Sequence, residues 1–237
     1  DYGEAVKWYL LAAEQGHVLS QNSLGGIYSG GKGAVPQDYE KAIKWYTLAA
    51  EQGDSSSQVS LARMYLSGNG VSQDSVEGMR LYHLAAKQGD NSAIIWFLGE
   101  EYVEGEHVAQ DYKEAFRLMT LAAENNSTFQ FLLGGYLEDG TLGWTNLRQA
   151  AKYYELAAKG GPYVDAQIKL GAMYEFGRGV LQDHTIAHMW YNVASKYSES
   201  GAKARGRVTE KMTPEGIFLA QTMARECLSN NYQNCGY

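Results

Sequence analysis

A nine-residue segment recurs six times along the chain at nearly constant spacing, and this repetition constrains the fold more than any other feature. It reads WYLLAAEQG at 8–16, WYTLAAEQG at 45–53, LYHLAAKQG at 81–89, LMTLAAENN at 118–126, YYELAAKGG at 153–161 and WYNVASKYS at 190–198. Successive copies start 37, 36, 37, 35 and 37 residues apart. Self-similarity at such a period indicates a repeat protein, in which one small unit is stacked many times.

A second pattern, Leu-Gly-x-x-Tyr, falls between these copies and divides each unit into two predicted helices. Its leucine and tyrosine, Leu24 and Tyr28 in the first copy, are four residues apart and therefore share one helix face. The helix that carries this pattern, here called the first helix of a unit, is predicted to end at glycines such as Gly68 and Gly177, because glycine readily adopts positive φ. The second helix is predicted to begin after a residue whose short side chain can cap it: Asp1, Asp38, Asp74, Asp111, Asn146 and Asp183.

A single hairpin cannot bury both of its apolar faces, so the units must stack on one another. The sequence predicts an all-α fold, a right-handed α-solenoid of helix-hairpin repeats with a C-terminal capping helix. Residues 1–200 would form the solenoid, with five complete helix pairs and an N-terminal half repeat, and residues 201–237 the cap and tail. Thr213-Pro214 marks the start of the capping helix, since threonine is a good cap and proline fits the first turn. Because Asp1 aligns with the start of a second helix, we also expect a longer chain upstream.

These motifs resemble the Sel-1-like repeat, a relative of the tetratricopeptide repeat. The resemblance rests on A-x-x-W/Y-Y-x-x-A-A-x-x-G followed by L-G-x-x-Y-x-x-G-x-G-V-x-Q-D-Y-x-x-A, and it runs from Asp1 to about Ser195. It implies an adaptor or scaffold, often bacterial and exported, and it brings no catalytic residues with it. Two departures concern local geometry. The fourth repeat has Gly-Thr-Leu-Gly-Trp at 140–144 and lacks the Gln-Asp pair. In the third of the second helices, Gly78 replaces the usual alanine.

The net charge of −7 is unevenly distributed, with −9 in residues 1–195 and +2 from Lys196 onward. Nucleic-acid affinity rests on Lys and Arg side chains that neutralise phosphates, so this charge predicts that nucleic acid is not the partner. No run approaches the ~18 apolar residues of a membrane span. We therefore expect a protein or peptide partner with an apolar or basic segment, bound by a chain that acts as a monomer or as part of a longer protein.

Two motifs suggest ligand chemistry but lack the context that this chemistry needs. Residues 26–33 nearly spell a phosphate-binding loop, yet they follow a helix rather than a strand and end in glycine where Ser or Thr must bind magnesium. His184 and His188 have the spacing of two zinc ligands, but no third ligand lies near them in the sequence. His17, His83 and His107 lie in separate units without a nucleophile motif beside them. We predict no metal and no cofactor.

The two cysteines, Cys227 and Cys235, lie eight residues apart at the end of the chain. An even count in a chain that otherwise avoids cysteine favours a disulfide, and with it an oxidising compartment such as the periplasm or the extracellular space. The alternative is two reduced thiols, as in a cytoplasmic protein. We expect no redox catalysis, because the Cys-x-x-Cys spacing is missing.

One face of the first helices contains the candidate binding site. With the core leucine at zero and about 100° per residue, the positions two before and two after it point away from the core. The residues two positions before the core leucines are Asn22, Val59, Trp96, Phe131 and Ile168. An outward face is ordinarily polar, whereas most of these side chains are apolar. We predict a partner-binding trough with an acidic rim, centred on the third and fourth repeats. Its residues are Val59, Arg63, Trp96, Glu100, Glu101, Glu104, Phe131, Gly135 and Ile168. The alternative is that this row packs against the neighbouring repeat.

The sequence thus predicts a non-enzymatic scaffold or adaptor that binds a peptide or a partner domain on its concave face. The alternative is an exported enzyme or binder that acts on cell-wall-type ligands. An enzyme would bring a few titratable groups together in one pocket, whereas an adaptor would present an open trough. No nucleophile and base stand out in the sequence, which favours the adaptor.

Overall fold

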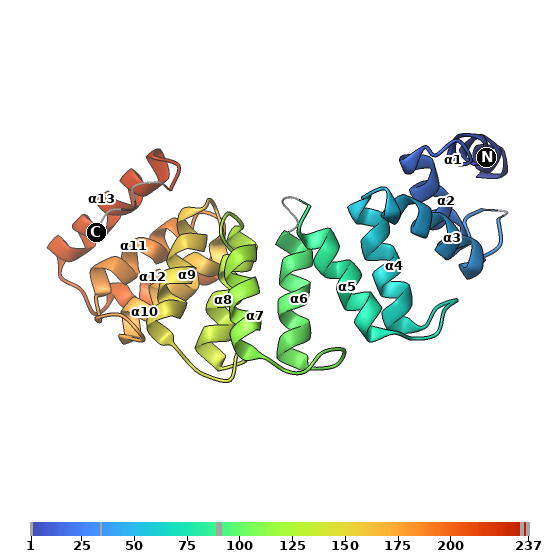
Figure 1. The fold of residues 1–237 in the computed structure, drawn as a ribbon. Helices are drawn as coiled ribbons and strands as arrows, with labels where there is room; N and C mark the ends of the chain where they lie inside the picture. The colour runs from blue at the N-terminus through green and yellow to red at the C-terminus, as the bar shows by residue number, and fades with distance from the viewer. Residues whose placement is uncertain (1, 34, 89–91, 233–234, 236–237) are drawn as a thin grey trace. The chain divides into compact units, whose positions relative to one another are not determined.

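The computed structural model describes residues 2–33, 35–88, 92–232 and 235, and within these ranges it contains thirteen helices and no strand (Figure 1). They are α1 (Tyr2–Ala13), α2 (Val18–Gly30), α3 (Tyr39–Glu51), α4 (Ser55–Ser67), α5 (Ser75–Ala86), α6 (Ser92–Glu104), α7 (Tyr112–Ala122), α8 (Ser127–Asp139), α9 (Leu147–Lys159), α10 (Val164–Phe176), α11 (His184–Ala194), α12 (Glu199–Thr209) and α13 (Pro214–Ser229). The predicted all-α fold of paired helices is confirmed. The first helices are α2, α4, α6, α8 and α10, and each is followed by its second helix.

The chain divides into two compact units, residues 1–118 and residues 119–237, which we call unit 1 and unit 2. The core leucines predicted from the repeat are at most 4% exposed in both units: Leu24, Leu61 and Leu98 in unit 1, and Leu133 and Leu170 in unit 2. Among the described residues, no helix is both long and apolar enough to cross a membrane.

The cap residue ties each first helix to the second helix that follows it. The backbone N–H of Asp38 donates to the carbonyl of Tyr28 at 2.8 Å, and the Asp38 carboxylate accepts from the backbone N–H of Lys41 at 3.0 Å. The other four caps make the same two kinds of bond: Asp74, Asp111, Asn146 and Asp183. These five predicted caps are confirmed, whereas Asp1 lies outside the described residues.

The residues around this tie close the turn between the helices. Nε2 of Gln73, the residue before a cap aspartate, donates to the carbonyl of Leu66 at 2.7 Å. The turn itself opens at Gly68, whose φ of 70° is in the left-handed region that favours glycine. The phosphate-loop-like segment at 26–33 is a turn of the same kind, because α2 ends at Gly30 and Gly31 follows with a φ of 60°.

The fourth repeat lacks the Gln-Asp pair and closes its turn differently. Oδ1 of Asp139 accepts from the backbone N–H of Thr141 at 2.9 Å and from its hydroxyl at 2.6 Å. Leu142 is fully buried, so the altered turn contributes an apolar side chain to the interior. The backbone N–H of Asn146 still donates to the Leu137 carbonyl at 2.8 Å, and the hairpin is therefore retained without the glutamine.

The glycine after the core leucine allows the two helices of a hairpin to cross closely. A Cβ atom on Gly134 would lie 2.8 Å from the ring of Tyr154, and one on Gly171 would lie 2.7 Å from the ring of Tyr191. The tyrosine rings therefore pack directly on the backbone of the first helix.

Gly78 departs from the repeat pattern for a related reason. A Cβ atom on it would lie 2.7 Å from the side chain of Leu66 and 3.1 Å from the carbonyl oxygen of Ala62. Ala62 stands where the other four first helices have a glycine after the core leucine: Gly25, Gly99, Gly134 and Gly171. In this repeat the second helix supplies the additional glycine that the crossing needs.

A buried glutamine three residues before the core leucine links successive repeats. Nε2 of Gln58 donates to the carbonyl of Ala50, at the end of the preceding second helix, at 3.2 Å. Its Oε1 accepts from Nε2 of Gln88 at 2.9 Å. Gln21 and Gln130 make the same bond to a carbonyl at the end of the second helix before them, at 3.0 and 2.9 Å. These amides add bonds at the helix ends, where the Ala13 and Ala50 carbonyls also accept from the backbone N–H groups of Gly16 and Gly53.

The C-terminal helix α13 packs on α11, as the predicted capping helix should. Its start is the predicted one: the Thr213 hydroxyl accepts from the backbone N–H of Gly216 at 3.2 Å, and Pro214 occupies the first helical position. Cys227 and Cys235 form the predicted disulfide, and both are buried. The disulfide joins the end of α13 to the tail.

We predict that Gly171→Ala destabilises the chain, because the added methyl group would overlap the ring of Tyr191. Overpacking of this kind costs ~1–3 kcal/mol, and chemical denaturation followed by circular dichroism would measure it. Gly206→Ala in α12 is the matched control, since a Cβ atom there meets nothing within 4 Å. Alanine in place of an unconstrained helical glycine should be neutral or stabilise by up to ~1 kcal/mol. Equal effects of the two substitutions would contradict the close crossing.

Candidate functional site

In unit 1 the helices α4, α5 and α6 border an open pocket of about 440 Å³. Residues from all three helices and from the turns after α4 and α6 line it: Arg63, Leu66, Ser67, Gln73, Tyr82, Phe97, Glu101, Glu106 and His107. The second helix contributes Tyr82, which packs across the hairpin, the first helices contribute Arg63 and Glu101, and the turn after α6 contributes Glu106 and His107. The repeat geometry therefore positions the pocket.

Glu101 and His107 form a close pair at one side of this pocket. Oε2 of Glu101 lies 2.7 Å from Nδ1 of His107, and the two side chains are 6% and 14% exposed. Glu101 is in the last turn of α6, and His107 is in the turn that follows. A carboxylate that is buried this deeply needs a polar partner, and the imidazole provides it. The pair holds the ring of His107 at the pocket wall.

The pocket also combines aromatic rings with a cation. The Tyr82 and Phe97 ring centroids are 4.6 Å apart. Nε of Arg63 donates to the Tyr82 hydroxyl oxygen at 3.2 Å. Burial raises the pKa of Tyr82, so its hydroxyl stays protonated at neutral pH. The pocket thus offers an apolar wall next to charged groups of both signs, which suits a side chain with an apolar stem and a polar tip.

The structure brings two of the predicted site residues of unit 1 to this pocket, Arg63 and Glu101. Val59 is half-buried and packs against the core of unit 1. Glu100 is half-buried, and Glu104 is exposed at the end of α6.

The prediction that Trp96 faces outward is wrong. Its side chain is only 4% exposed, and its indole N–H donates to Oε1 of Glu100 at 2.8 Å. The angular argument treated α6 as a helix with one buried side. In a stack of hairpins a helix is covered on more than one side, so the position opposite the core leucine can also be buried.

The predicted residues of unit 2 are half-buried on the first helices α8 and α10. The ring of Phe131 lies 5.5 Å from that of Tyr154 and 5.2 Å from that of Tyr163, so it packs between two aromatic rings. Ile168 packs against the cluster formed by α11 and α12. Gly135 is half-buried beside the Tyr154 hydroxyl. The predicted trough drew on both units, and as a whole it stays a prediction.

Sequence reasoning missed seven of the nine pocket residues, among them Phe97, Glu106 and His107. Phe97 directly precedes the core leucine of α6. The helical period alone does not distinguish the helix face of Phe97 from the core face. Glu106 and His107 lie in the turn after α6, where no helical period applies. The available signal was that Glu101 and His107 are a titratable pair six residues apart across a predicted turn.

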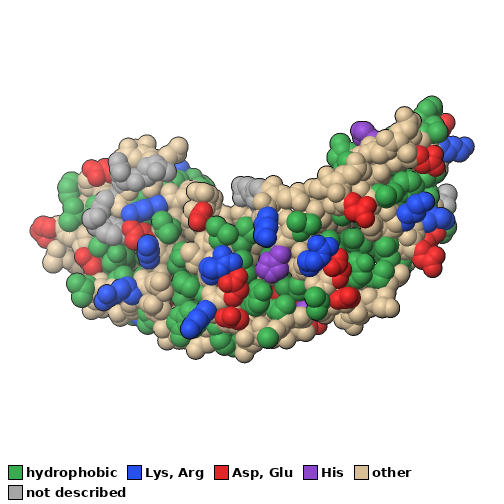
Figure 2. All heavy atoms as spheres, in the orientation of Figure 1, with side chains coloured by type: hydrophobic (Ala, Val, Ile, Leu, Met, Phe, Trp, Pro, Cys, Tyr) green, Lys and Arg blue, Asp and Glu red, His purple; other side chains and the backbone are tan. Residues whose placement is uncertain are grey.

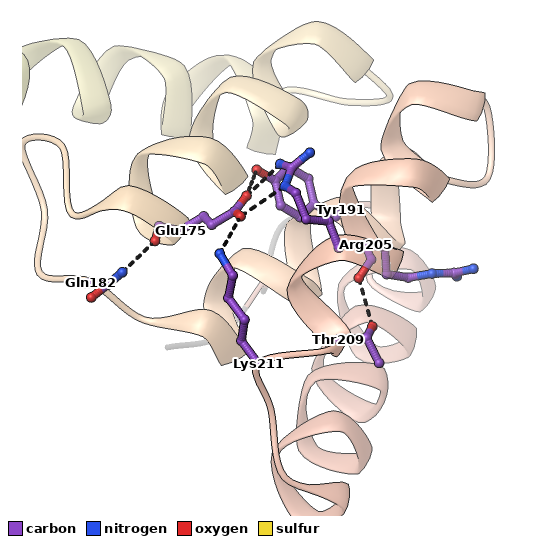
Figure 3. Close-up of polar contacts among 7 residues, drawn as sticks. Glu175, Gln182, Tyr191, Arg205, Thr209 and Lys211 are labelled. Atoms are coloured by element: carbon purple, nitrogen blue, oxygen red, sulfur yellow. Dashed lines mark hydrogen bonds and ion pairs between the residues drawn. The ribbon is translucent and has the colours of Figure 1, made fainter.

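Unit 2 contains a second charged cluster, centred on the fully buried carboxylate of Glu175 in α10 (Figure 3). Arg207 of α12 donates to it from both Nε and Nη2, at 3.1 and 2.7 Å. The Tyr191 hydroxyl donates at 2.9 Å, and Nζ of Lys211 lies 3.3 Å away. The hydrogen bonds from Arg207, with those from Tyr191 and Lys211, outweigh the effect of burial and lower the pKa of Glu175 to about 2.

Glu138 of α8 forms a similar cluster one repeat earlier. It accepts from the Tyr154 hydroxyl at 2.7 Å and pairs with Lys169 and Arg178, each at 3.0 Å. Burial opposes ionisation of this carboxyl, but the bonds from Tyr154 and Lys169 still lower its pKa. Glu138 and Glu175 both lie five residues after a core leucine, and this shared position was available in the sequence.

A family model described as the Sel1 repeat matches residues 1–17, 18–54, 55–90, 95–127, 128–162 and 164–196. The chain belongs to the Sel1 repeat family. The resemblance found in the sequence is thereby confirmed. Sel1 repeat proteins are generally protein-interaction scaffolds and are typically non-enzymatic.

Among solved structures, a Sel1 repeat protein from Oxalobacter formigenes is similar, with a TM-score of 0.62 and 28% identity over 88% of this chain. A protective antigen of uropathogenic Escherichia coli strains that displays an SLR fold shares 24% identity over 97% of this chain, with a TM-score of 0.47. The chain spans 60% of the first and 57% of the second of these proteins. A comparison with curated protein sequences gives no match.

The surface of this Sel1 chain mixes both signs of charge. Figure 2 shows acidic and basic side chains beside one another on the visible face, with apolar side chains between them.

The two histidines considered as zinc ligands are not part of a charged surface site. His188 is 1% exposed, and burial lowers its pKa. Among the described residues, no group of three His, Cys, Asp or Glu side chains is placed to hold a metal ion.

We predict that Trp96→Ala lowers the stability of this Sel1 chain by ~3–5 kcal/mol, because it removes a buried indole and leaves a cavity. The melting temperature followed by circular dichroism would report the loss. Trp8→Ala is the control in the same unit, since the side chain of Trp8 is 69% exposed and its removal should be nearly neutral. An unchanged melting temperature for Trp96→Ala would mean that the outward-facing prediction was right.

We predict that Glu175 stabilises the fold except in strong acid. Its folded pKa of about 2 lies below the usual 4.5, so its stabilisation is present above pH ~4.5 and is lost as the pH falls towards ~2. Glu175→Gln should therefore melt below the wild type at neutral pH, and the difference should shrink across this window. Glu199→Gln removes the same charge from an exposed pair with Lys203 and should show no such pH-dependent difference. A constant difference for Glu175→Gln would contradict the ionised, buried carboxylate.

Proposed function

We propose that this Sel1 protein is a scaffold that binds an extended segment of a partner protein on the first-helix face of unit 1. The observation that supports this most directly is the pocket bordered by α4, α5 and α6. Its volume of about 440 Å³ suits one large side chain, and it lies on the face formed by successive first helices. The bound side chain would have an aliphatic stem and a basic tip.

The chemistry of the pocket supports this choice of ligand. Phe97 and Tyr82 supply apolar surface for the stem. Glu106 is exposed at the rim, and Glu100 and Glu104 add negative charge on α6. Residues 1–118 contain 9 Lys and Arg against 16 Asp and Glu, so unit 1 has the whole net charge of −7. A basic segment would be attracted to such a field.

The remaining residues of the predicted site in unit 1 would also contribute to binding. Arg63 would orient the ligand backbone, since its guanidinium is exposed and already anchored on Tyr82. Trp96 holds the Glu100 carboxylate through its indole N–H. Val59 would add an apolar contact beside the pocket, whereas Phe131, Gly135 and Ile168 belong to unit 2 and are not part of this proposal.

The enzyme alternative would use the same pocket, because it gathers an acid, a histidine and an arginine. We favour binding for one reason of geometry. The Ser67 hydroxyl, the candidate nucleophile at the rim, donates to the carbonyl of Arg63 at 2.7 Å. It is thus engaged by its own helix rather than by His107. A nucleophile needs a base within hydrogen-bond reach.

We propose a periplasmic or secreted location for the protein. The disulfide between Cys227 and Cys235 supports this, because such bonds persist in oxidising compartments.

The test uses the full chain and fluorescein-labelled peptides in an anisotropy titration. A peptide of repeated Gly-Leu-Lys units should bind more tightly than one of repeated Gly-Leu-Glu units. Ser67→Trp, which fills the pocket, and Glu106→Lys, which reverses the charge at its rim, should each weaken the lysine peptide about tenfold. Glu40→Lys makes the same reversal on an exposed residue of α3 and should leave the affinity unchanged.

Three outcomes would speak against this proposal. Equal binding of the two peptides would remove the charge preference, and equal affinity of all three variants would place binding outside the pocket. Cleavage of the peptide during incubation, detected by mass spectrometry, would favour the enzyme alternative.

A further inference from the structure

We propose that the clusters around Glu138 and Glu175 in unit 2 form a cationic docking strip for an acidic segment of a partner protein. This site differs from the unit 1 pocket in place and in sign of charge. It rests on the geometry of four basic side chains, Lys169, Arg178, Arg207 and Lys211, which are held by carboxylates on two consecutive repeats.

Each cluster contains one more cation than its carboxylate can neutralise. The side chain of Glu175 is 0% exposed, and that of Glu138 is 11% exposed, so the carboxylates lie beneath their basic partners. Each accepts from a neutral tyrosine hydroxyl and from two basic side chains. One positive charge therefore remains at each cluster.

The cations themselves remain accessible to a ligand. The side chains of Lys169, Arg178, Arg207 and Lys211 are between 46% and 52% exposed. Arg207 binds Glu175 through Nε and Nη2, which leaves the N–H groups of Nη1 on the other side of the guanidinium. Figure 3 shows the side chain of Lys211 extending toward the Glu175 carboxylate. A second carboxylate would thus meet N–H donors whose positions are already set.

An acidic residue next to the first cluster has its own hydrogen-bond partner. Asp139 follows Glu138 in the chain, and its Oδ1 accepts from the backbone N–H and the hydroxyl of Thr141. Unit 2 as a whole has 11 Lys and Arg and 11 Asp and Glu, so its field does not repel an acidic ligand. Unit 1, with its net charge of −7, would repel one.

The occupant that fits best is a peptide segment with several Asp or Glu side chains. Carboxylates match the fork of an arginine and the point charge of a lysine. The spacing over two repeats favours a chain with more than one acidic group over a single small anion. Phe176 is 57% exposed and lies 5.8 Å from Nζ of Lys211, so it can contact an apolar residue of such a segment. A nucleic acid also carries several anions, so its binding is one of the outcomes that the experiment tests.

The experiment measures binding of a fluorescein-labelled peptide of repeated Glu-Gly-Ser units to the full chain by anisotropy. The wild type should bind this peptide, and the affinity should fall as salt rises from about 20 to 300 mM. Lys169→Gln/Lys211→Gln should weaken binding about fivefold or more, because two exposed charge contacts are lost. Each carboxylate keeps one cation in this variant, which protects the fold.

Two matched variants test whether the effect belongs to the strip. Lys203→Gln removes the same charge from α12, where the side chain is 74% exposed and pairs with Glu199, and should leave binding unchanged. Lys169→Arg/Lys211→Arg keeps both charges and should retain binding. Melting temperatures recorded for each variant would separate a loss of binding from a loss of structure.

The proposal is overturned by no binding of the glutamate peptide, by equal losses in Lys203→Gln and the double variant, or by tighter binding of oligothymidylate than of the glutamate peptide. The result is independent of the unit 1 pocket. Ser67→Trp and Glu106→Lys should not change binding of the glutamate peptide, and the double variant should not change binding of the lysine peptide.

Discussion

The residue that begins each second helix makes two hydrogen bonds at the point where the chain reverses, and the rest of the hairpin is built on them. A helix leaves carbonyls unpaired in its last turn and N–H groups unpaired in its first. In the α2–α3 hairpin, Asp38 satisfies one of each, through its backbone N–H to Tyr28 and through its carboxylate to Lys41. Because both partners are backbone groups, the tie does not depend on neighbouring side chains. This explains why the fourth repeat keeps its hairpin with Asn146 and without the preceding glutamine.

The close crossing that follows from this tie places a tyrosine hydroxyl at the same point of most repeats. The ring packs on the backbone of the first helix, as Tyr191 does on Gly171, and the hydroxyl reaches past it. What it meets there differs from repeat to repeat: Ser29 for Tyr46, Arg63 for Tyr82, Glu138 for Tyr154 and Glu175 for Tyr191. The tyrosine ring thus maintains the packing of the hairpin, and the partner of its hydroxyl varies from repeat to repeat. Both proposed binding surfaces lie where this variation occurs.

Much of the fold could be predicted because its determinants are local and repeat. The caps, the helix-ending glycines and the core leucines depend on residues within a few positions of one another. The candidate site is less local, and there the sequence was less informative. The burial of Trp96 depends on more than the helix that contains it, so an angle measured on α6 alone misplaced it. The bond between Arg207 and Glu175 joins residues 32 positions apart, and no repeat pattern pairs them. Only the shared position of Glu138 and Glu175 hinted at that cluster.

Both surfaces use a buried carboxylate to hold a neighbouring side chain in place before any ligand arrives. Glu101 fixes the ring of His107 in unit 1, and Glu175 fixes Arg207 and Lys211 in unit 2. A long basic side chain that is free in solution loses rotamer freedom when it binds, at a cost of ~0.5–1.5 kcal/mol for each side chain. Here the folded state already restricts the side chain, so ligand binding does not cause this loss of side-chain entropy. A low pKa of Glu175 keeps its carboxylate charged at neutral pH, and the cations above it keep their positions. A repeat scaffold can in this way acquire a new binding surface by placing one acidic residue under a tyrosine and basic residues on the next repeat, without any change to the bonds that close its hairpins.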